Sequence, residues 1–264
     1  MYFWILGQMG MESAAGSMQF RRGMQTVLLA ALLAAEGQIV SVGALAEDLW
    51  GGDQPESAEN ALQAHASRLR RKLQMLEPGR KQTRLVSQTG GYRLDLTGAR
   101  VDAMAFYDEI SAVRADPDMA PTEVIRRLRG ALALWRGPVF GGVTVGVAAQ
   151  AAAARLSATR ISVLELLFDT ELKLGQHSTI IPELTELVRG ETLNERLCEL
   201  LMVALYRSGR QTDALNAYQR MRHRMAEELG VDPSPMLRNH ERAILAHDRC
   251  LLLREDHRRL RATA

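Results

Sequence analysis

The segment from residue 57 to residue 96 constrains the fold more than any other part of the chain. Between residues 57 and 76, apolar residues recur every three or four positions, which places their side chains on one side of an α-helix. This stripe consists of Leu62, Ala66, Leu69, Leu73 and Leu76. Two strand-like runs, residues 84–89 and 92–96, then flank Gly90-Gly91, a strong signal for a hairpin. The sequence therefore predicts a helix with one buried face, followed by a β-hairpin.

The residues before this segment predict a small sheet and two further helices. Residues 2–6 and 17–20 have the composition of short strands. Residues 25–35 are rich in Leu and Ala, with Gly37 just beyond their end, and Ser41 can cap a short helix that ends at Trp50. A short helix, a turn, a longer helix and a hairpin in this order are typical of a winged helix-turn-helix.

After Gly98 the strand signals give way to helical patterns. We expect helices over residues 102–115 and 122–135 and one long helix over residues 148–174. Gly175 and Gly209 are 34 residues apart in similar surroundings, and 34 residues is the tetratricopeptide period. The predicted fold class is mainly α: a winged helix-turn-helix with small antiparallel β-sheets over residues 1–98, then an all-α, tetratricopeptide-like domain over residues 99–264.

Length, charge and composition bound the class of protein. A chain of 264 residues suggests about two domains, and its net charge of +2 requires no polyanionic partner, so the position of the charges decides. The longest apolar run falls far short of the roughly 20 residues of a membrane-spanning helix. Cys198 and Cys250 form neither a CxxC motif nor a metal-ligand spacing with histidine, so we expect no metal site and a reducing cytoplasm.

Motifs typical of enzymes are missing from the sequence. The chain has no Gly-rich phosphate-binding loop, no GxSxG and no HExxH. We therefore expect neither catalysis nor a cofactor.

The face of residues 57–76 opposite the apolar stripe is polar and suited to DNA. Amide side chains can bond adenine with two hydrogen bonds, and arginine can bond O6 and N7 of guanine. On a winged-helix arrangement this helix enters the major groove. The residues expected to contact base edges are Asn60, Gln63, Ser67 and Arg68.

A second set of residues is expected to contact phosphates or the grooves. The end of this helix and the residues after it form a basic run: Arg68, Arg70, Arg71, Lys72, Arg80, Lys81 and Arg84. Such a run is on its own most often a solvated surface, but its position beside a winged helix-turn-helix favours phosphate binding. Trp50 has the plain alternative of packing between helices, and Arg93 that of facing the protein. The full set is Trp50, His65, Arg70, Arg71, Lys72, Arg84, Gln88, Thr89 and Arg93.

Several motifs resemble one known family across almost the whole chain. Residues 45–51 (LAEDLWG), 67–73 (SRLRRKL) and 90–94 (GGYRL) look like the OmpR-type winged helix of the Streptomyces antibiotic regulatory protein family. Residues 133–138 (ALWRGP), 204–211 (ALYRSGRQ) and 228–235 (ELGVDPSP) resemble its bacterial transcriptional activation domain.

The resemblance implies a pathway-specific activator of a secondary-metabolite gene cluster. Such a protein is expected to bind short direct repeats near the −35 element of double-stranded promoter DNA as a homodimer, and to recruit RNA polymerase through its sigma factor. One position departs from the pattern: wings of this type often carry an arginine where this chain has Gln88, which lacks the charge favoured in a narrow minor groove.

Two other classes of function remain open from the residues alone. The helical repeats could serve a protein-binding adaptor whose N-terminal domain does not recognise DNA sequence. A ligand sensor or an enzyme is the third alternative, since the absence of motifs does not exclude a bound small molecule.

Overall fold

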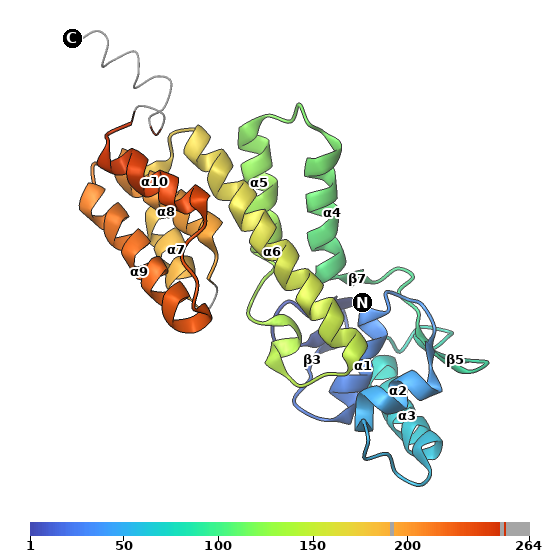
Figure 1. Ribbon diagram of the computed structural model, residues 1–264. Helices are drawn as coiled ribbons and strands as arrows, with labels where there is room; N and C mark the ends of the chain where they lie inside the picture. The colour runs from blue at the N-terminus through green and yellow to red at the C-terminus, as the bar shows by residue number, and fades with distance from the viewer. Residues whose placement is uncertain (191–192, 249–250, 252–264) are drawn as a thin grey trace. The chain divides into compact units, whose positions relative to one another are not determined.

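The computed structural model describes residues 1–190, 193–248 and 251 and is mainly helical, with small sheets near the N-terminus (Figure 1). This confirms the predicted fold class. Contacts group the chain into two units, residues 1–118 with 127–161, and residues 119–126 with the described residues from 162 onward. A domain boundary at residue 98 stays a prediction. No helix within the described ranges is long and apolar enough to cross a membrane.

Four short strands form the first sheet. Strands β1 (Tyr2–Trp4), β2 (Gly10–Ser13) and β3 (Gly16–Gln19) are antiparallel neighbours, and β7 (Arg100–Val101) pairs with β1 in parallel. The sequence predicted strands at residues 2–6 and 17–20 and missed β2 and β7. Because β7 runs parallel to β1, the sheet is mixed rather than wholly antiparallel.

Strand β1 ends two residues earlier than predicted because a carboxylate takes over its hydrogen bonds. The backbone N–H groups of Ile5 and Leu6 donate to the carboxylate of Asp102 at 2.8 and 3.1 Å. Asp102 is fully buried at the start of α4 (Asp102–Ala115). Burial raises the pKa of this carboxyl, and the backbone donors oppose that shift. The carboxylate thus fastens the N-terminal sheet to α4.

Three helices form the core of the predicted winged helix-turn-helix. They are α1 (Met24–Ala34), α2 (Val42–Trp50) and α3 (Ala58–Leu76), and each contacts the other two. The hydroxyl of Ser41 accepts a hydrogen bond from the N–H of Ala44 at 3.2 Å, as expected of the cap. All five residues of the predicted α3 stripe are buried, with at most 6% of their surface exposed. The boundaries agree with the sequence prediction to within one or two residues.

The wing is a three-stranded sheet in the order β4-β6-β5. Strands β5 (Leu85–Gln88) and β6 (Gly91–Leu94) form the predicted hairpin, and β4 (Val40–Ser41) pairs with β6 on its other side. The two glycines are required for different reasons. Gly90 has a φ of +84°, whereas a Cβ on Gly91 would lie 2.2 Å from the carbonyl oxygen of Val40. The glycine pair therefore serves both the turn and the close approach of β4.

The helices that follow lie close to their predicted positions. Helix α4 spans the predicted residues, and α6 (Val147–Lys173) is the expected long helix. Helix α5 (Pro121–Leu132) ends three residues before the expected end. Beyond Leu132, the N–H groups of Leu134 and Trp135 bond carbonyls three residues back, which tightens the backbone out of the α-helix. A short 3₁₀ turn, η1 (Val139–Gly142), precedes α6.

The second unit contains the helix pairs predicted from the 34-residue period. Helices α7 (His177–Arg189), α8 (Glu195–Arg207), α9 (Gln211–Leu229) and α10 (Pro235–Leu245) pack in succession, α8 against both α7 and α9 (Figure 1). Gly175 and Gly209 have φ values of +77° and +74° at the ends of α6 and α8. Cys198 is buried in α8, and burial raises the pKa of its thiol to about 12. Cys250 lies outside the described residues.

Candidate nucleic-acid interface

The outward side of α3 carries the residues expected to read bases. Asn60, Gln63 and Arg68 are exposed and Ser67 is half-buried, while the apolar stripe of the same helix faces the core. Asn60, Gln63 and Ser67 follow one another at helical spacing and share one face. Arg71 continues this face one turn later and is also exposed. The fold thus presents hydrogen-bonding side chains along one side of a supported helix.

Arg70 holds the wing against α3. Its Nε donates to the carbonyl of Leu85 at 2.9 Å, and its Nη2 donates to the hydroxyl of Ser87 at 2.5 Å. The guanidinium carbon also lies 5.9 Å from the centre of the Tyr92 ring. Arg70 was expected among the phosphate contacts, but all three contacts are to β5 and β6. Its observed role is to position the wing.

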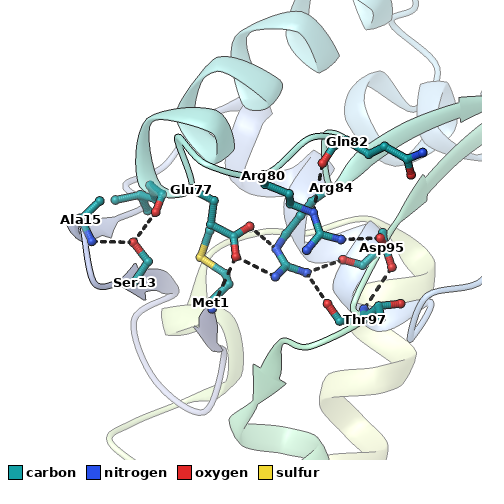
Figure 2. A network of polar contacts seen from close by, with 10 residues as sticks. Met1, Ser13, Ala15, Glu77, Arg80, Gln82, Arg84, Asp95 and Thr97 are labelled. Atoms are coloured by element: carbon teal, nitrogen blue, oxygen red, sulfur yellow. Dashed lines mark hydrogen bonds and ion pairs between the residues drawn. The ribbon is translucent and has the colours of Figure 1, made fainter.

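Arg84 is part of a buried ion-pair network rather than of the exposed basic surface. Figure 2 shows its guanidinium between the carboxylate of Glu77 and the chain after β6. It donates to the two carboxylate oxygens of Glu77 at 2.5 and 2.8 Å, and to the carbonyls of Asp95 and Thr97 at 2.7 and 3.2 Å. Only 2% of its surface is exposed. The expectation that Arg84 contacts DNA is therefore wrong, because its charge is already bound inside the fold.

The same network neutralises a second basic residue of the run. Arg80 pairs with the carboxylate of Asp95 at 2.5 Å. The hydrogen bond from Arg84 lowers the pKa of Glu77, and hydrogen bonds from Thr97 lower that of Asp95. The charges along the sequence do not reveal this pairing, because Asp95 comes close to Arg80 only when the hairpin folds back. The basic surface is smaller than the sequence suggested.

Trp50 and His65 lie together where α2 meets α3. Their ring centres are 6.2 Å apart with the planes tilted by 56°, and both side chains are half-buried. Burial lowers the pKa of His65, and the nearby Arg68 lowers it further. Both effects favour the neutral form of the imidazole in the protein alone.

The wing tip carries the remaining predicted residues. Gln88 and Thr89 are exposed at the hairpin turn, and Arg93 is half-buried on β6. Gln88 lies opposite Gly91 in the strand register. The hairpin thus presents an uncharged polar tip.

Two arginines that the sequence did not single out lie beside α3, around a hollow that Arg68 and Lys72 also line. Arg21 and Arg22 are exposed in the loop between β3 and α1. The available signal was a basic pair directly before a helix whose N-terminus lacks both a side-chain cap and an acidic residue.

Comparison with known proteins identifies both halves of the chain. Residues 22–94 match the family described as "Transcriptional regulatory protein, C terminal", and residues 101–245 match the family described as "Bacterial transcriptional activator domain". These two matches together cover most of the described chain.

Several relatives that match most of this chain are named as regulators. The chain is 38% identical to Transcriptional regulator RedD of Streptomyces coelicolor over 92% of this chain and 70% of the relative. It is 35% identical to Regulatory protein DnrI of Streptomyces peucetius over 86% and 85%. Regulatory protein AfsR of Streptomyces coelicolor is 42% identical, but the chain spans only 23% of its length.

A solved structure has the same fold over most of this chain. The structure of Mycobacterium tuberculosis EmbR in complex with a low affinity phosphopeptide is 29% identical with a TM-score of 0.81. The match covers 93% of this chain and 65% of that one. From the two matched families and these relatives, this chain belongs to the Streptomyces antibiotic regulatory protein family of transcriptional regulators.

Proposed function

We propose that this protein is a sequence-specific, DNA-binding activator of a secondary-metabolite gene cluster, with α3 in the major groove of its promoter. The observation that carries the proposal is the exposed polar face of α3 on a helix whose opposite face is buried. Family membership supports the regulatory role.

The residues of α3 divide into two roles in this proposal. Asn60, Gln63, Ser67 and Arg68 contact base edges, since their amide, hydroxyl and guanidinium groups match the donors and acceptors of the major groove. Phosphate contacts set the register of the helix without reading sequence. We assign these to Arg71, Lys72, Trp50 and His65.

The wing contributes a weaker groove contact. Gln88 and Thr89 lie at its exposed tip and Arg93 on its β6 strand, so the tip can donate hydrogen bonds but brings no charge of its own. Arg70 acts through the wing, which it ties to α3.

Two copies of the chain are proposed to bind direct repeats near the −35 element and to recruit RNA polymerase through its sigma factor. Repeats about one helical turn apart, roughly 34–36 Å, present both copies on one face of the duplex. Stacked helix pairs such as α7 to α10 provide the kind of surface on which helical-repeat domains bind other proteins.

Selection from a random duplex library with the full chain tests the proposal. We expect enrichment of a short motif present twice in the same orientation, and footprinting on a promoter containing it should protect both copies. Addition of the protein to RNA polymerase should then raise transcription from that promoter in vitro. A pool that stays random after selection would refute DNA sequence recognition and favour the protein-binding adaptor.

A further inference from the structure

A basic hollow lies beside α3, on the side away from the wing contact of Arg70. Its volume is about 470 Å³, and it is formed by the loop between β3 and α1, the start of α1 and one side of α3. The charged and aromatic residues of its lining are Phe20, Arg21, Arg22, His65, Arg68 and Lys72. None of them belongs to the ion-pair network around Arg84.

The charge of this hollow is uncompensated. No carboxylate lines it, and no ion pair within the described part of the chain involves Arg21, Arg22 or Lys72. The ammonium of Lys72 lies 5.1 Å from the centre of the Phe20 ring, which holds it at the hollow without neutralising it. With Arg68, the hollow is lined by four cations, and four cations on a small concave surface favour a bound anion.

The start of α1 adds to this positive potential. Its N-cap is Gly23, which has no side chain to accept a hydrogen bond from the first turn, and that turn contains no acidic residue. The hydroxyl of Thr26 instead donates to the carbonyl of Arg21 and thereby fixes the loop. The loop arginines and the first residues of α1 line the same hollow.

The position of the hollow points to the class of anion. His65, Arg68 and Lys72 follow one another at spacings of three and four on α3, and Arg68 is the neighbour, three residues away, of Arg71 at the end of the polar face. We propose that the hollow binds a phosphate of the DNA backbone at the edge of the groove that α3 enters, with Arg21, Arg22 and Lys72 as its cationic ligands. Arg68 lies at the boundary between this phosphate and the bases. The proposal rests on the proposed function and adds a contact from outside the helix-turn-helix.

Charge removal in the full chain gives the first test. Because phosphate contacts do not read sequence, Arg21→Ala/Arg22→Ala should weaken binding to a duplex of arbitrary sequence and to a selected sequence by the same factor. The slope of log K against log salt should flatten by about 2. The matched control is Arg189→Ala/Arg220→Ala, which removes the same charge from α7 and α9 and should leave the slope unchanged.

A scan of the duplex with neutral methylphosphonate linkages locates the contact. In the wild type, one or two adjacent substitutions should weaken binding, and in Arg21→Ala/Arg22→Ala these same substitutions should have no further effect. Identical scans for both proteins would overturn the proposal. So would binding of inorganic phosphate at the hollow together with unchanged DNA binding, which would make it a site for a free anion.

Met24→Glu separates DNA binding from folding. A carboxylate in the first turn of α1 favours the helix electrostatically but repels a phosphate in the hollow. We expect a Tm that is unchanged or higher and a DNA affinity that is lower. Wild-type affinity in this variant would contradict the proposal. The two proposals can fail separately. If the wild type selects no sequence, but these variants bind a duplex of arbitrary sequence more weakly than the wild type does, sequence recognition is refuted and the phosphate contact is supported.

Discussion

At the scale of single residues, neighbouring arginines of α3 differ in their contacts and in their proposed roles. Arg70 is bound to the wing, Arg71 extends the exposed face, and Arg68 lies beside the basic hollow. Their identical charge gives no hint of these differences in the sequence, because each role depends on which element the helix turns that side chain toward.

Arg68 and Arg71 should respond differently to truncation. Arg68→Ala should remove about 1–3 kcal/mol of discrimination at one base pair, whereas Arg71→Ala should weaken all duplexes alike and flatten the salt slope by about 1. Titrations against the selected sequence and its single-base variants, at several salt concentrations, measure both effects. An Arg68→Ala protein that loses affinity equally for every variant would exclude Arg68 from base reading.

Glu77 should contribute to stability through Arg84. Glu77→Gln leaves the guanidinium of Arg84, which is 2% exposed, without its counter-charge, and should lower the free energy of unfolding by about 1.5–3 kcal/mol. Urea unfolding measures this loss. Glu56→Gln removes an exposed carboxylate at the other end of α3 and serves as the control, with no change expected.

The same pair predicts a pH dependence of stability. The pKa of Glu77 lies below its ordinary value of 4.5 in the folded state, so its contribution is present above pH 4.5 and is lost as the pH falls through the folded pKa. Wild-type stability should therefore decline on the acid side, and Glu77→Gln should decline less. Equal declines in the two proteins would rule out this ion pair as a source of the acid sensitivity.

At the scale of elements, long amphipathic helices could be predicted and short strands could not. The α3 stripe repeats five times along one helix and is unambiguous, whereas β2 and β7 have only four and two residues, and β7 takes its pairing from β1 at the start of the chain. Arg84 shows the same limit for the site. It resembles a phosphate ligand in the sequence, but the fold surrounds its guanidinium with the carboxylate of Glu77 and the carbonyl of Asp95. Local pattern predicts elements, and tertiary contacts decide which charges stay free.

The glycine pair of the wing gives a test at this scale. In Gly91→Ala, the new Cβ would lie 2.2 Å from the carbonyl oxygen of Val40, so β4 must separate from β6 at a cost of about 1–3 kcal/mol. Faster hydrogen exchange at Tyr92 and a lower Tm would report this. Gly52→Ala is the control, because a Cβ there meets nothing within 4 Å and stability should not change.

At the scale of the whole molecule, a net charge of +2 conceals a strongly local basic surface. Arg80 and Arg84 are paired inside the fold, which leaves Arg21, Arg22, Arg71 and Lys72 as the cations proposed to meet phosphates. Four such contacts per chain predict a slope of about −3.6 for log K against log salt in non-specific binding. Titration of a duplex of arbitrary sequence measures it, and a slope near zero would contradict this count.

The contacts of Arg70 also fix the distance between the base pairs that α3 contacts and those that the wing contacts. Because its guanidinium ties β5 to the middle of α3, the wing tip cannot drift independently of the helix. The span between the base pairs under α3 and those under Gln88 is then a property of the protein. An operator with one base pair inserted between these two stretches, which adds about 3.4 Å of duplex, would offer this protein one half of its contacts or the other, but not both together.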